Sequence, residues 1–405
     1  MTLTRRNIMA LAAGAGLVPF APGVRIAKAA TPSAGNNILV FIYLRGGMDG
    51  LAMVAPAEDG IYRDNRRNSA VRSSGVNAGL PVGTLDGTPF FLHPAARQLK
   101  LMYDNKSLAI VHAAGVPTTS RSHFESQALV DLGMASNEPT PGAGWLTRHL
   151  QTRPGALGDF SATTDSATGS SALVGAVGLI PTESLEYLPN SIDAQRGALI
   201  AAVNEGNSAS AQAARRTVKL LDVIRDKTAK APPAPTGNGS YTFGPLSQSL
   251  KPLARVLKLD LGVEVAVVDY PAVWDTHENI LQFFTNATRE FSDSLFAFTD
   301  DLGDLMSRVT IVAMTEFGRR VEENSNGGTD HGEASCMLAL GAGVNGGKIY
   351  GQWPGLADTK LSGGDLKVTT DYRQVLSELL VNRMGQTSRD QIFPTIKYTP
   401  LGLAR

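Results

Sequence analysis

Carboxylate and imidazole side chains gather in several short polar motifs of this chain, and such side chains bind divalent cations in proteins. The 405 residues include one cysteine and six histidines, so any metal site must be built from Asp, Glu and His. The candidate metal ligands are Asp49, Asp275, His277, Glu316, Asp330 and His331. Mixed nitrogen and oxygen ligands suit zinc or manganese, and oxygen ligands alone suit magnesium or calcium.

Most of these motifs also have a purely structural interpretation. Asp49 could form an ordinary Asp-Gly turn, and Asp275 could cap a helix beside a surface histidine. Glu316 could pair with a nearby arginine and brace its loop. Asp330 beside His331, flanked by glycine, is an uncommon pairing for plain structure, because neighbouring Asp and His can ligate or orient a metal-bound water.

A second group of residues could attack or hold an anion. Ser120, Arg121 and Ser122 precede a predicted helix over 122–134, and the free N–H groups of a helix N-terminus favour negative charge. We therefore predict that Ser120 or Ser122 is a nucleophile and that Arg121 and Arg319 steady a substrate oxyanion. The alternative is that Ser122 only caps the helix, as its capping-box spacing indicates.

The elements that must position these side chains follow from the apolar pattern. Buried strands are predicted at 37–44, 108–111, 263–268, 309–314 and 335–340, with helices at 94–105, 122–134, 278–306 and 372–384 between and after them. Strands that alternate with helices indicate an α/β fold with a mainly parallel sheet. Such a sheet places ligands at the carboxyl ends of its strands, which is where the polar motifs fall.

Composition divides the chain further. We predict a mostly helical insertion or cap over 151–243, which ends in a Pro-rich linker and separates two parts of the α/β core at 30–150 and 244–405. The 37 basic and 37 acidic residues and the sequence pI of about 7.0 give no reason to expect a nucleic-acid partner. The content of 43% hydrophobic residues excludes a mainly disordered chain.

The first residues are typical of an export signal. Arg5 and Arg6 precede a short apolar run over 10–20 and an Ala-Lys-Ala sequence at 27–29. This order predicts a twin-arginine signal peptide over 1–29, with the export machinery as a partner and a periplasmic or secreted product. No other stretch approaches membrane-spanning length, so we expect no span in the mature chain.

Five motifs in order resemble the exported bacterial family called domain of unknown function 1501. They are Arg-Gly-Gly-Met-Asp-Gly (45–50), Ser-Arg-Ser-His-Phe (120–124), Trp-Asp-Thr-His-Glu-Asn (274–279), Thr-Glu-Phe-Gly-Arg (315–319) and Gly-Thr-Asp-His-Gly (328–332). That family looks like a distant branch of the alkaline phosphatase and sulfatase superfamily. The resemblance implies a three-layer α/β/α fold and a two-metal hydrolase with a hydroxyl or thiol nucleophile.

The resemblance also implies roles for single residues. Asp49 matches the first-strand Asp ligand, Asp275 and His277 match an Asp-and-His pair, and His331 resembles the last His ligand. In the relatives another Asp-His pair follows the strand equivalent to 309–314, whereas here Glu316-Phe317 stands there. Phenylalanine cannot bind metal, so one ligand of the two-metal site implied by the resemblance is missing. We therefore expect either one or two divalent cations.

The implied function is an exported metal-dependent hydrolase that acts on a small-molecule or polymeric phosphate or sulfate ester. An alternative is a non-catalytic binding or assembly protein that keeps the scaffold with a degenerate metal site. A third interpretation is a mutase or transferase that passes a phosphoryl group to an alcohol.

Overall fold

The computed structural model describes residues 36–153, 162–165, 170–176, 179–182, several positions between 206 and 227, 240–271 and 273–405. The predicted signal peptide over 1–29 lies outside the described residues, so it stays a prediction. Among the described helices, none combines the length and the apolar character needed to cross a bilayer.

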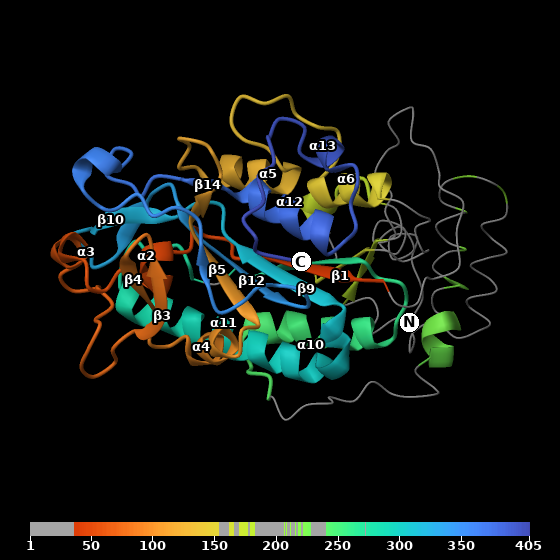
Figure 1. The fold of residues 1–405 in the computed structure, drawn as a ribbon. Helices are drawn as coiled ribbons and strands as arrows, with labels where there is room; N and C mark the ends of the chain where they lie inside the picture. The colour runs from red at the N-terminus through yellow and green to blue at the C-terminus, as the bar shows by residue number, and fades with distance from the viewer. Residues whose placement is uncertain are drawn as a thin grey trace.

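A large central sheet organises the fold (Figure 1). Its strands are, in spatial order, β13 (Ile349–Tyr350), β5 (Leu108–Gly115), β12 (Ser335–Gly341), β9 (Val309–Met314), β1 (Ile38–Tyr43), β8 (Val265–Asp269), β6 (Ala162–Thr164) and β7 (Leu179–Pro181), with β14 (Thr370–Asp371) paired to β5. Among these pairs only those of β12, with β5 and β9, are antiparallel. The predicted α/β fold with a mainly parallel sheet is therefore confirmed.

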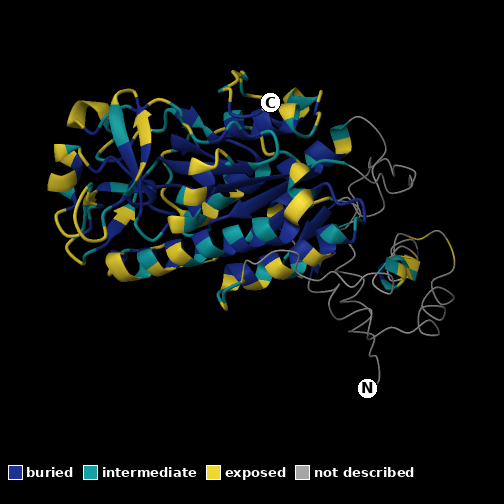
Figure 2. Ribbon diagram, turned by 60° about the horizontal axis from the view of Figure 1, so that its bottom comes forward, coloured by how far each residue is buried: buried dark blue, intermediate teal, exposed yellow. Residues whose placement is uncertain are grey.

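Helices cover both faces of this sheet (Figure 1). One face carries α4 (Arg97–Asp104), α10 (Pro245–Lys258) and α11 (Ile280–Leu302), and the other carries α5 (His123–Leu132), α6 (Trp145–Thr152), α12 (Tyr372–Asn382) and α13 (Arg389–Ile392). Alternate residues of β1 enter opposite cores, because successive side chains of a strand point to opposite faces. Val40 packs in the core of the first face and Phe41 in that of the second. The sheet is thus buried between two layers of helices (Figure 2).

The apolar run of β1 explains its central position. All six side chains of Ile38–Tyr43 are buried, and the strand pairs in parallel with β9 on one side and β8 on the other. A strand with no polar face can only be accommodated inside a sheet that is covered on both sides. The carboxyl ends of β9, β1 and β8 consequently lie side by side, which brings together the loops that follow them.

Two small sheets were not predicted from the sequence. One contains β2 (Val54–Ala55), β4 (Thr88–Leu92) and β3 (Leu80–Leu85), and the other is the hairpin of β10 (Arg319–Glu323) and β11 (Thr329–His331). The short helix α2 (Gly50–Met53) connects β1 to β2, and α3 (Gly60–Asn65) lies between β2 and β3. The hairpin places two of the predicted ligands, Asp330 and His331, near the edge of the main sheet.

Part of the predicted insertion belongs to the main sheet. Within 151–243, β6 and β7 extend the sheet beyond β8 as parallel strands. Much of the remaining insertion lies outside the described residues, so the division into core and helical cap stays a prediction.

Candidate metal centre

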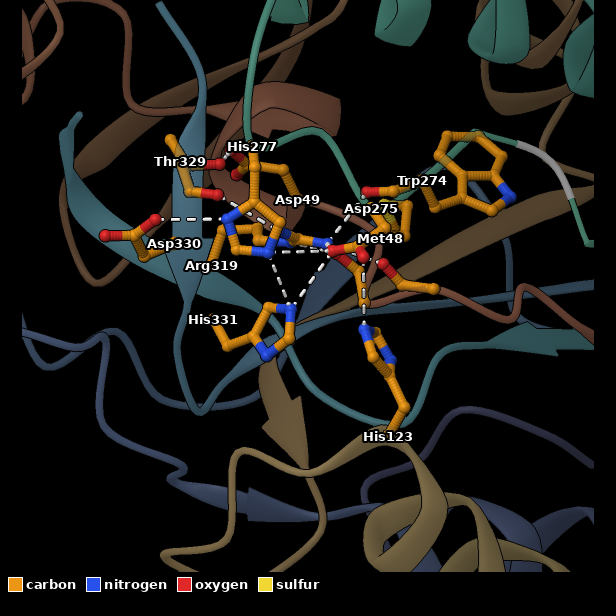
Figure 3. A network of polar contacts seen from close by, with 12 residues as sticks. Met48, Asp49, His123, Trp274, Asp275, His277, Arg319, Thr329, Asp330 and His331 are labelled. Carbon is orange, nitrogen blue, oxygen red and sulfur yellow. Dashed lines mark hydrogen bonds and ion pairs between the residues drawn. The ribbon is translucent and has the colours of Figure 1, made fainter. Parts of the chain in front are cut away.

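Polar residues from four loops meet at the carboxyl edge of the sheet (Figure 3). Asp275 and His277 follow β8, Glu316 follows β9, and His331 ends β11. His123 is the first residue of α5, whose N-terminus Ser122 caps as predicted. The fold therefore brings together side chains that lie more than two hundred positions apart in the sequence.

Asp275 occupies the middle of this group (Figure 3). Its Oδ1 lies 3.0 Å from Nε2 of His331 and 3.1 Å from Nε2 of His277. Its Oδ2 lies 3.5 Å from Nε2 of His123. Burial opposes ionisation of Asp275, but the hydrogen bond and charge of Arg319 outweigh it and lower the pKa of the carboxyl group to about 2. Asp275 therefore carries a full negative charge at neutral pH.

The three histidines share one pattern of hydrogen bonding through Nδ1. Nδ1 of His123 lies 2.8 Å from Oε1 of Glu316, and Nδ1 of His331 lies 2.8 Å from the carbonyl oxygen of Arg121. Nδ1 of His277 lies 3.1 Å from Oδ1 of Asp330. Carboxylate and carbonyl oxygens only accept hydrogen bonds, so each Nδ1 carries the proton and donates. The second ring nitrogen, Nε2, faces the carboxylate of Asp275 in each case. A protonated Nε2 donates to Asp275, and a deprotonated Nε2 offers its lone pair to a cation.

Glu316 is a buried carboxylate that orients His123. Its Oε1 also accepts from Gln127 and from the backbone N–H of Gly46, each at 2.9 Å, and its Oε2 accepts from the Thr315 hydroxyl at 2.9 Å. Burial opposes ionisation, but the His123, Gln127 and backbone donors lower the pKa of Glu316. The hydrogen bond to Glu316 in turn raises the pKa of His123. The sequence predicts Glu316 as a ligand. In the structure it instead orients the candidate ligand His123 through a hydrogen bond.

The donor set fits a divalent cation. His123, Asp275 and His331 each offer one ligand atom, and these atoms all lie within 4.8 Å of one another. Nε2 of His123 is buried and has no hydrogen-bond partner among the described residues. Two imidazole nitrogens and a carboxylate oxygen are the ligand types of zinc and manganese sites. His277 is a further candidate, since its Nε2 approaches both Asp275 and His331.

Asp49 lies apart from this group. It caps α2, and both of its oxygens bind the buried guanidinium of Arg66, at 2.6 and 3.2 Å. The Thr329 hydroxyl donates to the same carboxylate at 3.3 Å. The structure therefore differs from the expectation that Asp49 converges with the other ligands, because Arg66 already neutralises its charge.

Arg319 also differs from its expected role. Its side chain is buried, and it donates to the carbonyl oxygens of Gly47 at 2.7 Å and of Thr329 at 2.9 Å, and to Oδ1 of Asp275 at 2.6 Å. A fully buried guanidinium whose three nitrogens all donate to the protein is not accessible to a substrate oxyanion. Arg319 instead ties the loops after β1 and β8 to the β10–β11 hairpin and fixes the carboxylate of Asp275.

The predicted nucleophiles, Ser120 and Ser122, lie in the segment that leads into α5, next to His123. The Ser120 hydroxyl donates to Oε2 of Glu125 at 2.6 Å, and the Ser122 hydroxyl accepts from the Glu125 backbone at 3.5 Å. Arg121 is exposed and pairs with the buried carboxylate of Asp365. Of the predicted ligands, Asp275, His277 and His331 meet directly, and Asp330 supports His277 from outside.

Sequence reasoning did not select His123 as a ligand. It lies in the motif over 120–124, from which the sequence predicts roles only for Ser120, Arg121 and Ser122. The signal that could have found it is its position directly after the helix cap, because the first residue of a helix lies beside whatever the N-terminus faces. The partner that orients it, Glu316, is 193 positions away and no local pattern connects the two.

Sequence comparison identifies the family. The family described as "Protein of unknown function (DUF1501)" matches residues 36–376, and the chain belongs to this family. No protein with a curated description matches the sequence.

Solved structures of similar fold are distant. The C-terminal periplasmic domain of EcEptC from Escherichia coli is 9% identical with a TM-score of 0.39, and 92% of each chain is covered. The lipoteichoic acid synthase LtaP from Listeria monocytogenes is 10% identical with a TM-score of 0.33, covering 91% of this chain and 81% of the other. An alkaline phosphatase superfamily protein from Vibrio parahaemolyticus is 10% identical with a TM-score of 0.33, covering 86% and 71%. Such distant likenesses carry no argument about activity.

Proposed function

We propose that this protein is an exported, metal-dependent hydrolase of phosphate or sulfate esters. The observation that carries the proposal is the convergence of His123, Asp275 and His331, with the Nε2 atoms of both histidines directed at one carboxylate. Side chains that only stabilise a fold have no need of three imidazoles held in the same tautomer by three separate acceptors. A site prepared in this way for a cation is the usual design of metal centres, in which outer hydrogen bonds set the ligands.

His123, Asp275 and His331 would hold the cation, with His277 as a fourth candidate ligand. The cation would polarise the ester and lower the pKa of the attacking hydroxyl or water. Zinc and manganese suit this mixture of nitrogen and oxygen ligands better than magnesium or calcium.

Ser120 is the better placed of the two predicted nucleophiles. Its hydroxyl already donates to Glu125 at 2.6 Å, so Glu125 could accept the proton as the oxygen bonds to phosphorus or sulfur and the bond from that atom to the alcohol oxygen breaks. Water would then hydrolyse the seryl ester and restore the serine. The Ser122 hydroxyl is directed to the backbone of α5 as a cap. Arg121, exposed on the same segment, can bind an anionic substrate with the donors that do not contact Asp365.

The alternative is a binding or assembly protein with a structural metal. The observation in its favour is Phe317, whose ring centroid lies 4.7 Å from those of both His123 and His331. An apolar ring against the candidate ligands narrows the space for a substrate. This alternative predicts metal binding without turnover.

The test combines metal content with turnover. The purified protein is stripped with a chelator, reloaded with Zn²⁺ or Mn²⁺, and assayed on nitrophenyl phosphate and nitrophenyl sulfate. The proposal expects bound metal and metal-dependent hydrolysis of one of the two esters, both lost in His331→Ala. Metal binding without hydrolysis of either ester would favour the alternative, and protein that binds no metal would refute both.

Export is a separate part of the proposal and rests on the signal sequence over 1–29. Replacing Arg5 and Arg6 by lysine should retain the protein inside the cell, because the twin-arginine route reads the arginine pair. Cell fractionation of the two forms measures this, and an unchanged distribution would contradict the predicted route.

A further inference from the structure

The histidine cluster and the Asp49–Arg66 pair lie at the same edge of the sheet but differ in how their charge is balanced. Arg319 donates to Oδ1 of Asp275, but this carboxylate is half-exposed and also faces three imidazoles that can leave it for a cation. The carboxylate of Asp49 faces a guanidinium that is fixed in the chain. We propose that the site binds one divalent cation and not two, with Arg66 supplying the permanent positive charge beside Asp49. This inference rests on the proposed metal-dependent function.

Arg66 is built into its place. Its Nε donates to the carbonyl oxygen of Val321 at 3.0 Å and its Nη2 to that of Arg320 at 2.8 Å, in addition to the two contacts with Asp49. The guanidinium and the carboxylate are both fully buried. A cation that replaced Arg66 would leave a buried guanidinium without its counter-charge, which is strongly unfavourable. Asp49 is therefore not available as a metal ligand.

Of the other potential ligands around Asp49, His112 is engaged through both ring nitrogens and His93 through Nδ1. His112 places Nε2 at 2.8 Å from the carbonyl oxygen of Val54, while its Nδ1 accepts from the backbone of Ala113 at 2.7 Å. Nδ1 of His93 accepts from the backbone of Ala95 at 3.2 Å. Burial keeps Cys336 a thiol by raising its pKa to about 12. These groups fill the space beside Asp49 as neutral, hydrogen-bonded or packed side chains.

Glu316, a second carboxylate near the cluster, is occupied as well. Both of its oxygens accept hydrogen bonds, from His123, Gln127 and Gly46 on one side and from Thr315 on the other. Phe317 follows it in the chain and stands where a ligand could otherwise reach the cluster. Within the described part of the chain, His123, Asp275 and His331 are the one group of such side chains close enough to share an ion.

Native mass spectrometry of the intact protein tests this inference. The protein is stripped with a chelator, reloaded with a moderate excess of Zn²⁺ or Mn²⁺, and its mass is measured under non-denaturing conditions. One ion per chain is the expected result. Two ions per chain would overturn the single-cation inference and leave the proposed function standing, whereas no bound ion would refute the proposed function and this inference with it.

A double variant locates the ion. Asp49→Asn with Arg66→Gln removes both charges of the buried pair and keeps their approximate shapes. The expected result is one ion per chain with the affinity of the unmodified protein, while His331→Ala loses the ion. Loss of the ion in the folded double variant would show that Asp49 is a ligand and would overturn the inference. Should the double variant fail to fold, the stoichiometry of the unmodified protein still decides the question.

Discussion

The Nε2 atoms of His277 and His331 lie 2.9 Å apart. Because the Nδ1 atom of each ring donates to its own acceptor, both Nε2 atoms carry lone pairs when the rings are neutral. Two lone pairs at this separation repel unless a proton or a metal ion lies between or beside them. In the metal-free protein a proton on one Nε2 makes this contact an N–H···N hydrogen bond, and a cation bound beside both atoms would take the place of that proton.

Replacing His331 by alanine should abolish stabilisation by metal. In the unmodified protein, Zn²⁺ at about 100 times its dissociation constant should stabilise the fold by about 2.7 kcal/mol, because the ion binds only the folded state. Thermal unfolding with and without Zn²⁺ measures the effect. His149→Gln is the control, since His149 contacts Gln386 and no member of the cluster. A metal-dependent shift that persisted in His331→Ala would contradict the assigned ligands.

Glu316→Gln tests the role of the residue behind His123. The amide group keeps one oxygen for the donors of His123, Gln127 and Gly46 but loses the negative charge, so its hydrogen bond to the imidazole is weaker and fixes the ring less firmly. We expect metal affinity to fall about 10- to 100-fold, the usual effect of losing such an outer hydrogen bond. Isothermal titration with Zn²⁺ measures it, and Glu322→Gln, at an exposed position, is the matched control. Equal Zn²⁺ affinities in the two variants would show that Glu316 does not orient His123 for metal binding.

Replacing Ser120 and Ser122 one at a time should separate an effect on catalysis from an effect on stability. Ser122→Ala removes the cap of α5 and should cost about 1 kcal/mol of unfolding free energy while turnover continues. Ser120→Ala removes the hydroxyl bound to Glu125 and should abolish turnover with little change in stability. Chemical unfolding and ester hydrolysis are measured on both variants. The opposite assignment, with turnover lost only in Ser122→Ala, would make the capping serine the nucleophile.

His112 should make the fold sensitive to acid. Burial lowers the pKa of His112 to about 4, whereas an unfolded histidine titrates near 6.5. The unfolded state therefore binds a proton first as the pH falls, and this contribution to stability is present above about pH 6.5 and lost toward pH 4. The loss amounts to about 3 kcal/mol at most.

Comparison with His112→Gln isolates this contribution. Burial raises the pKa of Asp131 and Asp165 to about 6, which acts in the opposite direction over the same pH range, and both groups are present in the two proteins. Urea unfolding of metal-free protein from pH 7 to pH 4.5 should show a smaller decline for the variant. Parallel declines would show that His112 does not contribute.

Much of the fold could be predicted because its core strands are continuous apolar runs. The run over 37–44 predicts β1 within one residue at each end, and the run over 309–314 matches β9. The hairpin of β10 and β11 could not be predicted in this way. Its residues Arg319–Glu323 are mostly polar, and its position depends on Arg319, a buried side chain that contacts the loops after β1 and β8 as well as β11.

The candidate site was predicted in part for the same reason. Asp275, His277 and His331 follow or end strands, and the geometry of a parallel sheet indicates that such positions converge. The expectation for Asp49 followed the same rule, but the sequence does not reveal that Arg66 folds back onto it. His123 was missed because its partner Glu316 is supplied by another strand. In both cases the role of the residue depends on a side chain from a distant segment, Arg66 for Asp49 and Glu316 for His123, and the local sequence pattern does not encode such contacts.

The most direct test of the metal centre is anomalous X-ray scattering at the zinc absorption edge, from crystals of stripped and reloaded protein. We predict one strong peak per chain within bonding distance of Nε2 of His123, Nε2 of His331 and the carboxylate of Asp275. A map without a peak at this position, or with the ion bound beside Asp49, would contradict the account.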